Sequence, residues 1–136
     1  VLDGAHNVDS ARILAKFLKP EFSGKKWVFI IGILERKDAA AIIKQLVPLA
    51  KAFFFVPVPH SDCYSPSDLQ IITTTFLAHK DPKDPPIIKT FKNWKLALKR
   101  ATEPSSHRAI CICITGSLYL AGSVLRQIHK ADKLST

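Results

Sequence analysis

The chain has 136 residues, of which 47% are hydrophobic and 23% charged, and it carries a formal net charge of +9. That length suits one domain with a buried core and is too short for two. The longest apolar runs are far shorter than a membrane span and no secretion leader is present, so we expect a cytoplasmic protein without membrane contact.

The positive charge is compatible with nucleic acid, with anionic small molecules or with an ordinary solvated surface. The lysines are scattered and form no dense run with interleaved aromatic residues, which a stacking platform for nucleic acid needs. A solvated surface or attraction to anionic small molecules explains the charge as well as nucleic acid does, and we expect no nucleic-acid partner.

Three cysteines are present, Cys63, Cys111 and Cys113. Cys111 and Cys113 lie two apart on an expected strand, which is poor geometry for a disulfide. No second Cys or His pair supplies the spacing of a zinc site. We expect buried, reduced thiols and no metal ligands in this chain.

The sequence contains no methionine and opens on the apolar residues Val1 and Leu2. We interpret it as a fragment of a longer protein in which these residues end a strand. Part of the active site is then expected outside the fragment.

The first helix is expected shortly after these two strand residues. Asn7 can cap it, because an Asn side chain accepts hydrogen bonds from the first helical turn. Apolar residues follow at helical spacing, namely Ala11, Leu14, Ala15 and Leu18. Pro20 and Gly24 then break the pattern.

Two buried strands, 27–31 and 52–58, are expected next, because nearly continuous apolar runs suit a parallel sheet covered on both faces. Between them Asp38 can cap a helix over 39–46, which Pro48 stops. A further helix starts at Ser65-Pro66, a typical cap and first position. Its apolar stripe is Leu69, Ile72, Phe76 and Leu77.

The last third predicts strands at 87–91 and 109–114, with a helix between them marked by Trp94, Ala97, Leu98 and Ala101. The final helix is expected to bury the stripe Leu118, Ala121, Leu125 and Ile128. Strand and helix alternate about five times over residues 1–136, which favours one α/β domain with a mainly parallel, doubly wound sheet and helices on both faces.

Three strand-to-helix turns carry candidate functional residues: DGAHN after Leu2, GILERKD after Ile31 and TGSLY after Ile114. The carboxyl ends of parallel strands meet at one edge of a sheet, where ligands bind. The three turns are therefore expected to lie together.

Each candidate also has an ordinary structural interpretation. Asp3 can accept bonds from ribose hydroxyls or form a backbone turn. His6, beside a helix start, can donate to a phosphate or a developing oxyanion. Lys37 can complement a carboxylate or simply be solvated, and Ser117 can hold a carboxylate, cap the last helix, or do both.

Two further motifs point to no chemistry. His60 and Cys63 share one loop, but residues two or three apart in a loop rarely reach nucleophile–base geometry. The GxxxxGK[ST] phosphate loop is absent from the chain.

The stretches LDGAHN (2–7), IGILERKD (31–38) and TGSLYLAG (115–122) together resemble the carboxy-terminal domain of folylpolyglutamate synthase and bifunctional dihydrofolate synthase. These enzymes belong to the Mur ligase superfamily of ATP-dependent amide-bond ligases. The resemblance covers the whole chain. The sequence departs from it at Val8, at Ser123 and in the 57–68 loop, which lacks an arginine that many relatives carry.

The resemblance implies a Rossmann-like, three-layer glutamate ligase domain. The P-loop and the ligands of Mg²⁺ are then expected on an absent amino-terminal domain, and the isolated chain should be an inactive monomer. The substrates would be ATP, L-glutamate and a folate or dihydropteroate whose carboxylate is activated as an acyl phosphate.

The resemblance also assigns roles to individual residues. Asp3, His6 and Asn7 would bind ATP, with Asp3 on the ribose and His6 reaching the phosphate and reaction centre as the catalytic residue. Lys37 and Ser117 would lie near the incoming glutamate.

Two alternatives stay open at this point. One is a cell-wall ligase of the Mur type, and the other is a non-catalytic α/β module that binds anions or nucleic acid.

Overall fold

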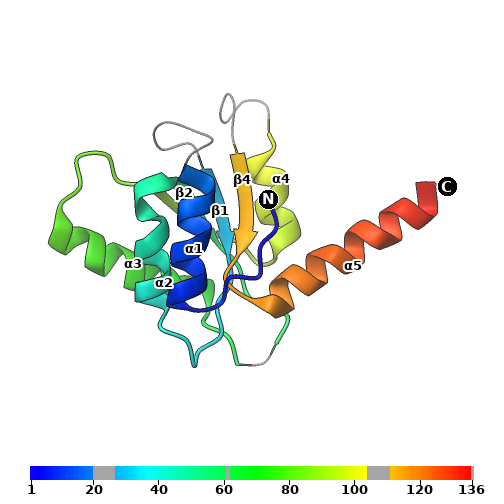
Figure 1. Ribbon diagram of the computed structural model, residues 1–136, viewed down its shortest axis with the longest axis horizontal. Helices are drawn as coiled ribbons and strands as arrows, with labels where there is room; N and C mark the ends of the chain where they lie inside the picture. Colours follow the sequence, from blue (N-terminus) through cyan, green and yellow to red (C-terminus); the bar gives the residue numbers. More distant parts are fainter. Residues whose placement is uncertain (20–26, 61, 104–110, 136) are drawn as a thin grey trace.

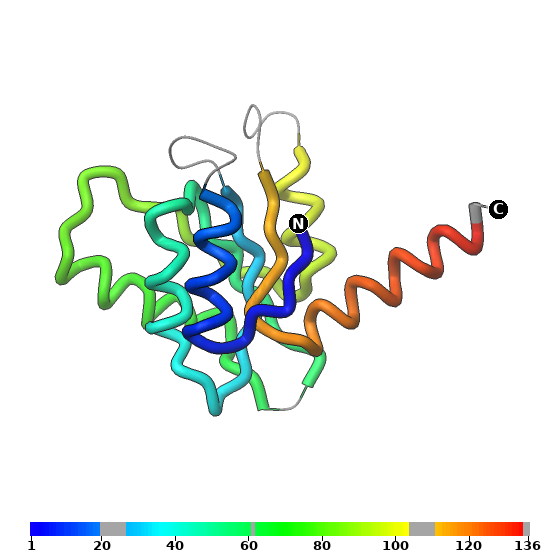
Figure 2. Tube along the Cα trace, in the orientation of Figure 1, coloured from blue at the N-terminus to red at the C-terminus, as the bar shows by residue number. Residues whose placement is uncertain are grey.

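The computed structural model describes residues 1–136 except 20–26, 61, 104–110 and 136. Four parallel strands form one sheet in the order β3-β2-β1-β4. Their bounds are β1 Trp27–Ile31, β2 Ala50–Phe55, β3 Ile87–Thr90 and β4 Cys111–Thr115. Residues 1–3 run beside β4 (Figure 2), where Leu2 forms a parallel bridge to Ile114. The first residues therefore extend the sheet, as predicted for the end of a strand.

Five α-helices connect and cover the strands (Figure 1). They are α1 Val8–Leu18, α2 Ala39–Leu46, α3 Pro66–Lys80, α4 Trp94–Ala101 and α5 Leu118–Ser135, with a short 3₁₀ helix η2, Val47–Leu49, after α2.

The sheet separates two hydrophobic cores, because alternate residues of a strand point to opposite faces. Trp27, Phe29 and Ile31 pack with α1, α2 and α3, whereas Val28 and Ile30 pack with α4 and α5. All five side chains are at most 3% exposed. This three-layer, doubly wound arrangement confirms the predicted fold class.

Helix starts follow the predicted capping residues. The side chain of Asn7 accepts a hydrogen bond from the Ser10 amide at 2.8 Å, and that of Asp38 accepts one from the Ala41 amide at 3.1 Å. Ser65 caps α3 in the same way, at 3.1 Å from the Asp68 amide. Each cap satisfies an amide that the helix itself cannot, so local sequence sets these boundaries.

Two strand boundaries differ from the prediction. β2 covers Ala50–Phe55 rather than 52–58, and Pro57, which has no amide hydrogen to donate to a ladder, lies just beyond it. β4 extends to Thr115, which pairs with Ile31. The predicted start of that strand at 109–110 and the helix breakers Pro20 and Gly24 lie outside the described residues.

The predicted apolar stripe of the last helix is wrong. Leu120 and Val124 are the α5 residues that enter the core, at 0% and 3% exposure, while Leu118, Leu125 and Ile128 are between 46% and 60% exposed. Figure 1 shows the helix leaving the body of the domain after its first turns. The sequence contains two apolar stripes on this helix, and helical spacing alone cannot select between them.

The three cysteines are free thiols, but only Cys113 is buried as predicted, whereas Cys63 and Cys111 are half-buried. Burial raises the pKa of the Cys113 thiol to about 12, so this side chain stays neutral in the core. No helix of the described chain is long and apolar enough to cross a membrane.

Candidate functional site

The candidate site lies where neighbouring strands send their helices to opposite faces of the sheet. β1 is followed by α2, which packs in one core, and its neighbour β4 is followed by α5, which packs in the other. A crevice at the carboxyl end of such a strand pair is where open α/β sheets bind ligands. All three predicted turns open at this edge.

Backbone contacts hold the three turns against one another. The Gly116 amide donates to the Ala5 carbonyl at 2.9 Å, and the Asp3 amide donates to the Ile114 carbonyl at 3.0 Å. Gly116 has a φ of 106°, and a β-carbon there would lie 2.6 Å from the Gly32 carbonyl oxygen. Only glycine fits a positive φ and so close an approach of two backbones.

A pocket of about 40 Å³ opens where the turns meet. His6, Lys37 and Ser117 line it, one from each turn. The remaining lining residues are Leu34, Arg36, Gly116, Leu118 and Tyr119. The structure therefore brings together three of the five residues that the sequence singles out.

His6 is held in one orientation by its own turn. Its Nδ1 lies 3.0 Å from the Gly4 carbonyl oxygen, which can only accept, so Nδ1 carries a hydrogen. Nε2 is then the ring nitrogen available to a ligand. It accepts a hydrogen bond in the neutral ring and donates one only in the imidazolium.

Lys37 is a half-buried cation beside the start of α2. Its backbone is fixed on both sides: the amide donates to the Leu34 carbonyl at 3.0 Å, and the Tyr64 hydroxyl donates to the Lys37 carbonyl at 3.1 Å. Within the described chain its ammonium has no ion-pair partner. The charge is therefore free to pair with an anion in the pocket.

Ser117 caps the first turn of α5. Its Oγ accepts hydrogen bonds from the Tyr119 amide at 3.1 Å and the Leu120 amide at 3.4 Å, and the residue is 1% exposed. The capping interpretation is thus confirmed. The hydroxyl hydrogen is not used by these bonds, so capping leaves one donor for a ligand in the pocket.

Asp3 and Asn7 do not line the pocket. Asp3 Oδ1 accepts from the Ala5 amide at 2.7 Å, which is the turn-forming interpretation of this residue. Asn7 uses its Oδ1 on the amide of Ser10. Both side chains shape the His6 turn, and a ligand would have to approach Asp3 through its second carboxylate oxygen.

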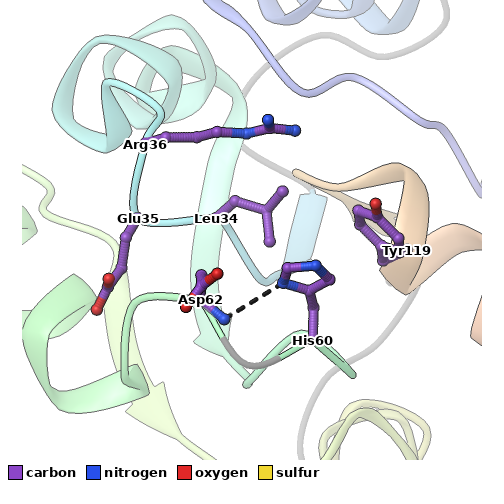
Figure 3. Close-up of a pocket in the computed structure, with 6 residues that line it drawn as sticks. All are labelled: Leu34, Glu35, Arg36, His60, Asp62 and Tyr119. Carbon is purple, nitrogen blue, oxygen red and sulfur yellow. Dashed lines mark hydrogen bonds between the residues drawn. The ribbon is translucent and has the colours of Figure 1, made fainter.

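A larger pocket of about 470 Å³ adjoins the first, and the sequence analysis missed it (Figure 3). Its lining residues are Leu34, Glu35, Arg36, His60, Asp62 and Tyr119, of which Leu34, Arg36 and Tyr119 also line the smaller pocket. The usable signals were the second cation next to Lys37 and the tyrosine inside TGSLY.

The loop after β2 contributes His60, but not as a partner of Cys63. The Cys63 thiol donates to the Val58 carbonyl at 3.6 Å, while the His60 ring lies 4.6 Å from the Tyr119 ring between centroids. In the described part of this loop the two side chains thus contact different partners. Among the described residues, no group of three or more His, Cys, Asp or Glu side chains could hold a metal ion.

Comparison with known proteins gives one family. The family described as "Dihydrofolate synthetase, C-terminal domain" matches residues 1–127. The folylpolyglutamate synthase of Lacticaseibacillus casei is 36% identical over 124 residues, which are 91% of this chain and 26% of the relative.

Solved structures agree on the fold. The folylpolyglutamate synthase of Mycobacterium tuberculosis, complexed with ADP and AMPPCP, matches with a TM-score of 0.75 and 24% identity over 92% of this chain and 28% of that chain. A bifunctional folylpolyglutamate synthase/dihydrofolate synthase with Mn, AMPPNP and L-glutamate bound matches with a TM-score of 0.73 and 21% identity, over 94% of this chain and 29% of that one. The chain thus spans between 26% and 29% of these relatives' lengths.

Proposed function

The chain belongs to the dihydrofolate synthetase C-terminal domain family, and from that membership we propose that it is the glutamate ligase domain of a longer, ATP-dependent enzyme. The enzyme would join L-glutamate to a folate or dihydropteroate carboxylate. Membership in this family favours a folate ligase over a cell-wall ligase or a non-catalytic binding module.

The observation that carries the proposal is the pocket shared by His6, Lys37 and Ser117. An amide ligase must neutralise a phosphoryl group and a carboxylate that lie close together. A histidine, an unpaired lysine and a helix N-terminus on one pocket supply that positive field.

The reaction has two steps. The acceptor carboxylate attacks the γ-phosphorus of ATP, forming an acyl phosphate and releasing ADP. The amine of L-glutamate, with its lone pair free, then attacks the acyl carbon to give a tetrahedral intermediate. Collapse of this intermediate expels phosphate, the amine nitrogen loses its proton, and the amide remains.

His6 is the catalytic residue of this proposal. Because Nδ1–H is bound to the Gly4 carbonyl, the imidazolium would present Nε2–H to an oxygen of the transferring phosphoryl group. That hydrogen bond would stabilise charge that builds up during both steps.

Lys37 and Ser117 would bind the incoming amino acid. The Lys37 ammonium would pair with its α-carboxylate, and the Ser117 hydroxyl, whose oxygen caps α5, would donate its hydrogen to the same group. Holding this carboxylate positions the amine toward the acyl phosphate.

ATP would bind beside the first turn, residues 3–7. We assign the ribose hydroxyls to Asp3 through the oxygen that the turn leaves unused, and a supporting contact to Asn7. The P-loop and the ligands of a Mg²⁺ ion would lie on a separate amino-terminal domain, since this chain spans only 26% to 29% of its relatives' lengths. The enzyme would be a cytoplasmic monomer, and closure of the two domains would exclude water from the acyl phosphate.

The test is ATP-dependent addition of L-glutamate to a folate by the full-length protein. His6→Ala should lower kcat by roughly 100- to 1,000-fold, the usual loss for one donor to a developing anion. His79→Ala, in the last turn of α3, is the matched control and should keep full activity. Unchanged activity in His6→Ala would rule out the role given to this residue, and the 136-residue chain alone should show no turnover.

A further inference from the structure

We propose that the larger pocket is a subsite for the side-chain carboxylate of the incoming amino acid, with Arg36 as the residue that selects a dicarboxylic substrate. This inference rests on the proposed function. It adds a residue and a specificity that the three-turn pocket alone does not provide.

Position along the sheet edge gives the first reason. The turns follow the strand order, so residues 3–6 come first, then Ser117 after β4, then Lys37 after β1, and His60 after β2. Phosphoryl chemistry is assigned to His6 at one end. The adjoining pocket is lined from Tyr119 in the β4 turn, across the β1 turn, to the loop after β2. It therefore extends away from His6, in the direction in which the part of the amino acid farthest from its reacting amine would extend.

Size and continuity give the second reason. The His6 pocket has about 40 Å³, whereas the adjoining one has about 470 Å³ and shares Leu34, Arg36 and Tyr119 with it. Ligand pockets commonly have about 300–1,000 Å³. For an amino acid whose α-carboxylate is held at Lys37, the larger pocket offers the side chain room that the smaller pocket lacks.

Arg36 supplies the charge that this space needs for a carboxylate. Its guanidinium has no ion-pair or side-chain hydrogen-bond partner in the part of the chain that the structure describes. Figure 3 shows Arg36 reaching toward the side where Tyr119 lies, while Glu35 points downward, away from Arg36. The Glu35 carboxylate therefore does not occupy the guanidinium, whose planar group can bind a carboxylate with two parallel hydrogen bonds.

His60 and Tyr119 form the opposite wall. The Asp62 amide donates to His60 Nδ1 at 3.2 Å, which assigns the hydrogen of the neutral ring to Nε2. The two rings are in contact, with centroids 4.6 Å apart, and Leu34 closes the base of the pocket (Figure 3). This wall accommodates the methylene groups of a side chain and offers the Nε2–H and the Tyr119 hydroxyl as additional donors.

The two acidic residues of the pocket repel a bound carboxylate, which makes the effect of removing Arg36 easier to measure. Glu35 and Asp62 are exposed, and their backbones are joined by a hydrogen bond from the Glu35 amide to the Asp62 carbonyl at 2.9 Å. The lining carries one guanidinium against these two carboxylates, so removing Arg36 takes its formal charge from −1 to −2. L-glutamate binding should then fall, while L-glutamine, which is nearly the same shape but uncharged, should be little affected.

Steady-state kinetics of the full-length enzyme with each amino acid tests the proposal. Arg36→Gln should raise KM for L-glutamate roughly 10- to 100-fold, the loss expected for a charge-assisted hydrogen-bonded pair. KM for ATP should not change, and the preference for L-glutamate over L-glutamine in kcat/KM should fall by the same factor. Arg36→Lys keeps the charge but cannot form two parallel hydrogen bonds, so its KM for L-glutamate should lie between those of the wild type and Arg36→Gln.

Arg12→Gln is the matched control, because Arg12 lies on α1 outside both pockets and undergoes the same change of charge. It should leave every constant unchanged. An unaltered KM for L-glutamate in Arg36→Gln, with the wild type active and the variant folded by thermal melting, would overturn the subsite alone. A rise in KM for the folate acceptor instead would overturn it in favour of the acceptor's own carboxylate, and an inactive wild type would overturn the proposed function itself.

Discussion

Replacing Gly116 by alanine tests the packing of the three turns. The backbone there has a φ of 106°, and the new β-carbon would lie 2.6 Å from the Gly32 carbonyl oxygen and 3.0 Å from Ile31 Cγ2. Holding a non-glycine residue at such a φ costs about 1–3 kcal/mol. The contact with Gly32 adds to that cost, because a backbone carbonyl cannot move aside as a flexible side chain can.

A total loss of about 2–4 kcal/mol in the free energy of unfolding is therefore expected. With a urea m-value of about 2 kcal/mol/M, the midpoint of unfolding should fall by about 1–2 M. Circular dichroism of the 136-residue chain in a urea titration measures this shift.

Gly122→Ala is the matched control. Its β-carbon would meet only Arg126 Nη1 at 3.6 Å, on the helix α5. The same substitution should there stabilise the protein by about 0.5–1 kcal/mol, since alanine favours a helix more than glycine does. If Gly116→Ala unfolds at the same urea concentration as the wild type, the close approach of the β1 and β4 turns is refuted.

Two further predictions concern strand β4 and the turn that follows it. Ser117→Ala removes the acceptor of the Tyr119 and Leu120 amides and should lower the free energy of unfolding by about 1 kcal/mol. Ser117→Thr keeps a hydroxyl and should retain most of that stability. Equal melting temperatures of the wild type and both variants would show that the cap does not stabilise α5. Above about pH 9 the Cys113 thiol of the unfolded chain ionises while that of the folded chain, whose pKa burial raises to about 12, stays protonated. The free energy of unfolding of the wild type should therefore fall with rising pH, with Cys113 contributing up to about 1.4 kcal/mol per pH unit. The fall should be steeper than in Cys113→Ala. Identical slopes for the two proteins would show that Cys113 ionises equally in the folded and unfolded states.

Local chemistry made much of the fold predictable. Asn7, Asp38 and Ser65 each cap a helix at the predicted residue, because a cap depends on neighbours three residues away. Apolar runs predicted β1 to the residue. The end of β2 agrees with Pro57, a local signal that the apolar run concealed. The buried face of α5 depends instead on which partner the helix meets, which periodicity does not contain.

The same distinction applies to the site. His6, Lys37 and Ser117 could be predicted to meet, because parallel strands carry their following turns to one edge. The adjoining pocket could not, since it needs the His60 loop to reach Tyr119, 59 residues along the chain. Nothing in the local sequence at either position requires that contact.

The most direct measurement is a structure of the full-length protein with a non-hydrolysable ATP analogue and L-glutamate bound. We expect the terminal phosphate beside His6 Nε2, the α-carboxylate against Lys37 and Ser117, and the side-chain carboxylate on Arg36. Both ligands bound away from the pocket of His6, Lys37 and Ser117 would contradict it.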